Sequence, residues 1–298
     1  MLVRDSSFAL NFKSGKLLRR LFAIIFAIAA AVALSSCGER TPKVLRIAVD
    51  ASFQPALEAL RPSFEQHCRC RLVITAGASG LLYSEIRAGD AEHPFDLFLS
   101  ADMARPVLLE KAGLTVPASR QTYARGQLAV WASAKISTNK SSGFSTLAAL
   151  ASQGASGATL TPRQLILLLG RGKHKLVVAD PQLAPDGDAA VKMLKKLRLW
   201  PRVKNRVVYA GHSGHAQIML HQGEGDLGLI PYGQALASGR RAQFMRIPYQ
   251  FHPPLDQQLV ILRGTRQRNL AIRFLQYLRS DPVQAQLLPL GFLPAQTH

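Results

Sequence analysis

The sequence of 298 residues has few cysteines, few aromatic side chains and few acidic groups. Three cysteines are too few for a disulfide-dense scaffold, and a hydrophobic content of 48% excludes a disordered chain or a collagen-like fibre. Only 18 acidic residues stand against 37 lysines and arginines, which gives a formal net charge of +19. This excess suits an anionic ligand, an anionic membrane surface or nucleic acid. The length suits about two domains.

One long apolar run is present, and it lies near the N-terminus. Leu21–Leu34 is apolar throughout and follows a basic stretch that contains Arg19 and Arg20. A run of this length is short for a membrane span of about 20 residues but typical of a secretory signal. The pattern predicts a signal peptide over residues 1–36, with a retained anchor helix as the alternative.

The signal region ends in Leu34-Ser35-Ser36-Cys37, which resembles a bacterial lipobox. The resemblance implies cleavage before Cys37 and lipidation of its side chain, with residues 37–43 as the lipidated N-terminus and tether. Attached acyl chains hold a protein on a membrane. We therefore predict an extracytoplasmic protein, periplasmic or on the cell-surface side and lipid-anchored, with no nucleic-acid partner.

Beyond residue 43, short apolar segments alternate with segments of helical periodicity. Val44–Val49 predicts a buried strand, for example, and Pro55–His67 places its apolar side chains at helical spacing. Such alternation predicts an α/β fold with parallel sheets between helices. A polar stretch, Lys135–Ser145, interrupts the alternation before it restarts, which indicates two α/β units, the second inserted in the first.

Three turns that follow predicted strands carry small and polar residues. They span Asp50–Phe53, Ala76–Gly80 and Asp180–Gly187. In open α/β sheets, ligands bind beyond the carboxyl ends of the strands, where amides and helix dipoles at helix N-termini favour an anion. Ser52 and Ser79 are therefore candidate donors to an anion, although each taken alone suits a helix cap equally well.

Six motifs follow one another along the chain. They are AVDASF (Ala48–Phe53), AGASGLLYSEIRAG (Ala76–Gly89), FDLFLSAD (Phe95–Asp102), RQTYARGQLAVWA (Arg120–Ala132), ADPQLAPDG (Ala179–Gly187) and GDLGLIPYGQALA (Gly225–Ala237). Taken in order, they resemble the substrate-binding proteins of molybdate ABC importers.

The resemblance implies a two-lobed periplasmic-binding-protein fold, each lobe a mainly parallel sheet flanked by helices, with the ligand cleft between the lobes. It implies a monomer with residues 44–128 and 250–298 in lobe 1 and residues 129–249 in an inserted lobe 2.

Five ligand contacts follow from this resemblance, position by position. They are the hydroxyls of Ser52 and Ser79, the backbone amides of Asp186 and Ser213, and the hydroxyl of Tyr232, the last only with a one-residue shift at Pro231. Asp186 departs from the family, which usually has a small or uncharged residue there. A carboxylate facing the cleft would repel a dianion, so we expect it to turn outward and cap the helix that begins near Asp188.

Histidine and cysteine side chains are the remaining candidates for chemistry. His212 and His215 are either two exposed histidines at a helix start or the source of an added imidazole donor to the ligand. A zinc site is not expected, because no third ligand accompanies them. Cys68 and Cys70 are expected to be free thiols or to pair with each other. A metal site is disfavoured, because with His67 they offer only three closely spaced ligands. No metal site and no cofactor are expected.

The sequence thus favours a binding protein and not an enzyme. It would capture a tetrahedral oxyanion, molybdate or tungstate, and deliver it to an ABC permease and its ATPase. One alternative keeps the fold and binds another oxyanion or a metal complex. The others are a ligand-sensing lipoprotein adaptor and a secreted serine hydrolase, the latter disfavoured because neither Ser52 nor Ser79 lies in a Gly-x-Ser-x-Gly elbow.

Replacing Cys37 with serine tests the anchoring prediction. The substitution removes the thiol that would carry the acyl chains, so we expect the protein to leave the membrane fraction or to remain as the uncleaved precursor. Cell fractionation and intact-mass analysis measure both outcomes. An unchanged mass together with unchanged membrane partition would contradict lipidation at Cys37.

Overall fold

The computed structural model describes residues 42–89, 95–138, 160–170, 173–240 and 243–295. The predicted signal peptide and Cys37 lie outside the described residues. From Lys43 onward the chain belongs to one compact unit, which contains two β-sheets. Among the described residues, no helix is long and apolar enough to cross a membrane.

The first sheet has the strand order β11-β4-β10-β3-β1-β2. β1 pairs in parallel with β2 and β3, whereas β10 runs antiparallel to β3 and β4. The sheet is therefore mixed, with a parallel half at one side. Its strands are β1 (Lys43–Asp50), β2 (Cys70–Gly77), β3 (Leu97–Ser100), β4 (Gln121–Gly126), β10 (Leu255–Ile261) and β11 (Leu293–Pro294).

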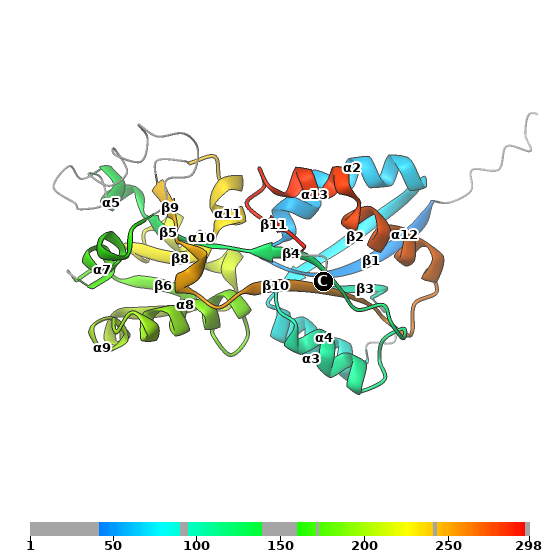
Figure 1. Ribbon diagram of the computed structural model, residues 1–298, viewed down its shortest axis with the longest axis horizontal. Coiled ribbons are helices and arrows are strands. Elements are labelled where there is room, and N and C mark those ends of the chain that lie inside the picture. The colour runs from blue at the N-terminus through cyan, green and yellow to red at the C-terminus, as the bar shows by residue number, and fades with distance from the viewer. Residues whose placement is uncertain (1–41, 90–94, 139–159, 171–172, 241–242, 296–298) are drawn as a thin grey trace, which may run out of the picture. The chain divides into compact units, whose positions relative to one another are not determined.

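Helices cover both faces of this sheet because its strands alternate apolar side chains between the faces. Ile47 and Val49 of β1 pack toward one set of helices, and Ala48 packs toward the other. Figure 1 shows the two sets on opposite sides of the sheet. One face carries α2 (Gln54–Cys68), α12 (Arg268–Arg279) and α13 (Asp281–Leu287), and the other carries α3 (Ser79–Ala88) and α4 (Ala104–Lys111).

The second sheet has the strand order β7-β6-β8-β5-β9. β6 runs parallel to β7 and to β8, whereas β5 runs antiparallel to β8 and to β9. It too is buried between helices on both faces. Its strands are β5 (Leu128–Ala132), β6 (Leu176–Ala179), β7 (Val207–Ala210), β8 (Leu227–Pro231) and β9 (Phe244–Arg246). One face carries α5 (Ala134–Thr138), α7 (Pro162–Gly170), α8 (Pro185–Lys196) and α9 (Trp200–Val203), and the other carries α10 (Ser213–Gln222) and α11 (Tyr232–Ala237).

The expected α/β architecture is confirmed, but the expectation of mainly parallel sheets is wrong. Both sheets are mixed, because β10 pairs antiparallel with β3 and β4 in the first sheet and β5 pairs antiparallel with β8 and β9 in the second. Several short elements also differ from the expectation. The chain passes from the first sheet to the second at Gln127, so the strand expected over Gln127–Ala132 begins at Leu128 and is preceded by β4. β4 was missed because its sequence, QTYARG, is largely polar. α11 was missed because it is only six residues long.

The cysteine pair closes the first βαβ connection. Cys68 and Cys70 form a disulfide with a Cα–Cα distance of 5.2 Å. Arg69 between them adopts a left-handed conformation with φ of +52°, which ends α2 and starts β2. The pair therefore belongs to a structural turn.

The start of α8 packs very closely on the end of β6. A Cβ atom at Gly187 would lie 2.1 Å from the carbonyl oxygen of Ala179 and 2.7 Å from its carbonyl carbon. Only a glycine permits this approach, because the atoms in the way are backbone. The first turn of α8, including Asp186, is buried as a result.

Gly187→Ala tests this packing. The added methyl forces α8 away from β6, so we expect a loss of about 2–3 kcal/mol in the free energy of unfolding. Gly264→Ala is the matched control, since a Cβ there meets open space, and its effect should stay within about 0.5 kcal/mol. Urea unfolding measures both, and equal stabilities for the two variants would contradict the close approach.

Candidate functional site

The carboxyl ends of the parallel strands bring distant turns together. β1, β2 and β3 are adjacent and parallel, so their final residues Asp50, Gly77 and Ser100 lie at one edge of the first sheet. In the second sheet, β6 and β7 likewise lead into α8 and α10. The N-termini of α3, α8 and α10 therefore carry Ser79, Asp186 and Ser213, and their first amides have no partner within the helix.

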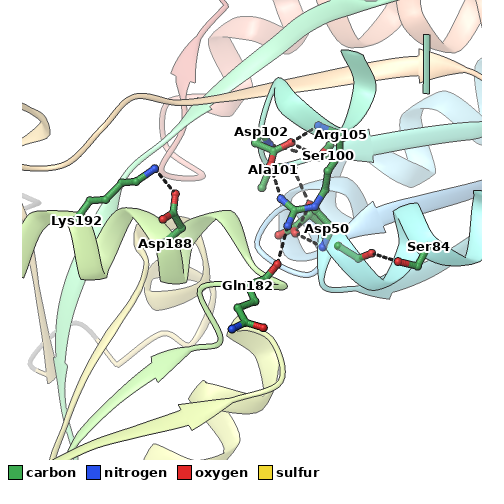
Figure 2. Close-up of polar contacts among 11 residues, drawn as sticks. Asp50, Ser84, Ser100, Ala101, Asp102, Arg105, Gln182, Asp188 and Lys192 are labelled. Atoms are coloured by element: carbon green, nitrogen blue, oxygen red, sulfur yellow. Dashed lines mark hydrogen bonds and ion pairs between the residues drawn. The ribbon is translucent and has the colours of Figure 1, made fainter. Parts of the chain in front are cut away.

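The Asp50 carboxylate holds the turns of the first sheet in place. Its Oδ1 accepts a hydrogen bond from the Ser52 amide at 2.9 Å. Its Oδ2 accepts two more, from the Ser79 amide at 3.0 Å and from the Ser79 hydroxyl at 2.5 Å. The Ser79 Oγ in turn accepts from the Ala101 amide, which follows β3 (Figure 2). Both serines are thus buried against an acidic residue that the sequence interpretation did not select.

Asp186 is buried, and the expectation that its carboxylate turns outward is wrong. Only 2% of the residue is exposed, and the carboxylate oxygens have no hydrogen-bond partner beyond the amides of their own helical turn. The cause is the tight seating of the first turn of α8, in which Pro185 and Gly187 are buried as well.

Burial also changes the acidity of this group. Loss of solvent is the main cause that raises the pKa of Asp186 to about 8, and the charge of Asp50 adds to the shift. The amides of Asp186 and Gly187 at the helix N-terminus oppose it. Because the folded protein holds this proton more tightly than the unfolded chain, the group destabilises the fold as pH rises from about 4 to about 8.

Ser213 begins α10 beside two histidines that cap the helix. Ser213 is buried and its hydroxyl has no hydrogen-bond partner. His212 Nδ1 accepts from the His215 amide at 3.2 Å, and His215 Nδ1 accepts from the Gly211 amide at 3.3 Å. Burial, followed by the neighbouring His215, lowers the pKa of His212 against the opposing effect of Asp50. Both Nδ1 atoms therefore act as acceptors at a helix start, which favours that interpretation over an added imidazole donor.

Two glutamines that the sequence interpretation missed complete the buried polar group. Gln234 on α11 donates from Nε2 to the Ala51 carbonyl at 3.1 Å, and Gln257 on β10 donates to the Ser52 Oγ at 3.4 Å. The side-chain oxygen of each is buried without a partner. The polar cluster is defined here as Asp50, Ser52, Ser79, Asp186, Ser213, Gln234 and Gln257.

The Tyr232 side chain is not a member of the polar cluster but packs in the core of the second sheet. It is the first residue of α11, and its ring meets Phe244 edge-on with centroids 6.0 Å apart. The Arg246 guanidinium lies 5.9 Å from the ring centroid. The ring thus belongs to the core on one face of the second sheet, and a solute contact by its hydroxyl stays a prediction.

Backbone contacts join α3 to the turn before α8. The Gly80 amide donates to the Leu183 carbonyl at 2.8 Å, and a Cβ at Gly80 would come within 2.9 Å of that oxygen. Arg105 of α4 pairs with Asp102 and donates to the Gln182 carbonyl (Figure 2). A cavity of about 790 Å³ lies beside this contact; Gly80 and Leu183 help to line it, whereas no acidic member of the polar cluster does.

The polar cluster supplies hydrogen-bond donors and acceptors. The Ser79 hydroxyl donates to Asp50 and the Ser52 hydroxyl accepts from Gln257, so neither is activated by a histidine in the part of the chain that the structure describes. In that same part, no three His, Cys, Asp or Glu side chains are grouped to hold a metal ion. Helix N-termini and buried hydroxyls instead supply donors to an anion.

The sequence model for bacterial extracellular solute-binding proteins matches residues 45–293. The chain belongs to this family. The molybdate-binding protein ModA of Azotobacter vinelandii is 29% identical to this solute-binding protein over 267 residues, which covers 89% of this chain and 95% of the relative. A Bacillus subtilis relative named as an ABC transporter substrate-binding lipoprotein is 26% identical over 259 residues, or 87% of this chain and 89% of its own.

The fold of the solute-binding protein agrees with a solved structure. The periplasmic molybdate-binding protein of Azotobacter vinelandii superposes with a TM-score of 0.68 at 26% identity, covering 85% of this chain and all of the other. The expected periplasmic-binding-protein fold is therefore confirmed.

Asp50→Asn tests the role of the buried carboxylate. An amide nitrogen cannot accept the hydrogen bonds that the Ser52 amide and Ser79 donate, so we expect a loss of about 2–4 kcal/mol in the free energy of unfolding. Glu224→Gln makes the same change at an exposed site and should stay within about 0.5 kcal/mol. Urea unfolding at neutral pH compares the two, and unaltered stability of Asp50→Asn would contradict this role.

Proposed function

We propose that this solute-binding protein captures molybdate outside the cytoplasm and passes it to the permease and ATPase of an ABC importer. The observation that carries the proposal is the set of buried helix N-termini of α3, α8 and α10, drawn from both sheets. The relative named as a molybdate-binding protein, which this chain matches over 95% of that protein's length, supports the same solute.

The solute would be held by neutral donors. Amides at Asp186 and Ser213 and hydroxyls at Ser52 and Ser79 are the proposed contacts, with Tyr232 as a fifth. The Ser79 hydroxyl would redirect its proton from Asp50 to the solute. Hydrogen bonds to a charged acceptor contribute about 1.5–3 kcal/mol each, so a handful suffices for tight binding after desolvation and closure costs. Tungstate has the same charge and shape and should bind similarly.

The protein would act as a monomeric binding protein without catalysis, anchored to the membrane through lipidated Cys37. The Bacillus subtilis relative, named as a lipoprotein, supports the anchor. Residues 44–128 and 250–298 would form one lobe and residues 129–249 the other. The passage at Gln127 from the first sheet to the second supports this division.

Isothermal titration with oxyanions tests the proposed solute. We expect molybdate and tungstate to bind and sulfate and phosphate to bind much more weakly. Ser52→Ala removes a buried donor and should weaken molybdate binding about ten- to a hundredfold. Ser238→Ala is the control, because that hydroxyl donates to the Ala235 carbonyl at the far end of α11, and its affinity should stay within about twofold.

The alternatives predict other results. Binding of phosphate or a cation without molybdate would replace the proposed solute with another ligand of the same fold. Wild-type molybdate affinity in Ser52→Ala would contradict the proposed contact at that residue.

A further inference from the structure

The polar cluster that contains the proposed solute contacts also contains two acidic side chains. Asp50 and Asp186 are both buried, and the charge of Asp50 acts on Asp186. Adding a dianion beside two ionised carboxylates would gather like charges in a buried space, at a cost that grows as the local dielectric falls. A binding site at this position therefore needs a way to remove one of these charges.

Hydrogen bonding distinguishes the two acids. The Asp50 carboxylate accepts three hydrogen bonds, so both of its oxygens already serve as acceptors within the protein. Asp186 is almost fully buried, and its carboxyl oxygens have no partner beyond the backbone amides of Asp186 and Gly187 in the same helical turn. A buried polar atom without a partner is costly, and a carboxylic acid can meet that cost by donating its proton to an acceptor.

Building on the proposed oxyanion function, we propose that Asp186 is a solute-binding side chain that carries a proton and donates it in a hydrogen bond to an oxygen of the bound anion. Its backbone amide and its side chain would then both face the solute as donors. No bond to hydrogen is broken in this step: the proton stays on Asp186 in the complex. The cleft would bind the dianion only when this carboxyl is neutral.

Among the described residues, no cation contributes to the pKa shift of Asp186. Asp50 at the end of β1 is the charged group that acts on it, and Asp188 on its own helix pairs outward with Lys192. Arg105 on α4 is held by Asp102. From α10, the Nδ1 atoms of His212 and His215 accept backbone amides.

From β4, Tyr123 is buried, and loss of solvent and then Asp50 raise its pKa, so it stays neutral. The acidity of Asp186 agrees with the proposed donor, since a pKa of about 8 leaves the carboxyl about nine-tenths protonated at pH 7 and about one-tenth at pH 9. Molybdate is a dianion over this whole range. Its affinity should therefore fall about tenfold from pH 7 to pH 9, with uptake of nearly one proton per anion bound at pH 9.

Calorimetry of the wild-type protein with sodium molybdate tests this inference directly. Titrations at pH 7, 8 and 9, each in buffers of different ionisation enthalpy, give the affinity and the number of protons taken up. We expect the tenfold loss and rising proton uptake in the wild type. In Asp186→Asn the amide keeps a donor without titrating, so affinity at pH 7 should stay within about threefold and the pH dependence should vanish.

Two further variants separate the possible outcomes. Asp188→Asn removes the same charge from a half-exposed position on the same helix and should keep the wild-type pH profile. Asp186→Ala retains the backbone amide but loses the side-chain donor, so its affinity at pH 7 should fall about tenfold or more. Equal or better binding by Asp186→Ala would show that the carboxyl only obstructs the solute and would overturn the inference.

The wild-type measurement also distinguishes this inference from the proposed function. Molybdate binding that is flat from pH 7 to pH 9 would overturn the role of Asp186 and leave the solute in place. Absence of molybdate binding at every pH would overturn both. Circular dichroism of each variant at pH 7 and pH 9 confirms that the folded protein is being compared.

Discussion

The hydrogen bonds to the buried Asp50 carboxylate are the interaction on which the first half of the site depends. One side chain gathers the amides and hydroxyl that end β1 and begin α3, and through Ser79 it reaches the end of β3. Parallel pairing alone brings three strand ends to one edge of the sheet. The carboxylate then fixes the turns between them, so Ser52 and Ser79 are held in place without a solute.

Close backbone packing around α8 determines how deeply the second half of the site is buried. Gly187 lets α8 start against the Ala179 carbonyl, and Gly80 lets α3 meet the Leu183 carbonyl. These approaches bury Asp186 where a surface helix would expose it. The same packing that orients the helix N-termini therefore raises the pKa of an acidic group beside them. Solute binding at the proposed site would then be linked to the protonation of Asp186.

Much of the fold was predictable from the sequence because it depends on local patterns. Apolar runs such as VLRIAV predict buried strands, and the turns after them predict where a ligand binds. The orientation of Asp186 was not predictable, because it depends on the fit of Gly187 to β6, a contact set by tertiary packing. Gln234 and Gln257 were missed for a similar reason: each reaches the first turn from a segment about two hundred residues away.

The proposed site is an oxyanion enclosed by the N-termini of α3, α8 and α10 beside a neutral Asp186. A crystal structure of the protein grown with tungstate near neutral pH would locate the anion, because tungsten is identified by its anomalous scattering. We expect one tungstate between Ser79, Asp186 and Ser213, with an Asp186 carboxyl oxygen within hydrogen-bond distance of the anion. A tungstate bound elsewhere, or bound there with Asp186 turned away, would contradict the proposed site.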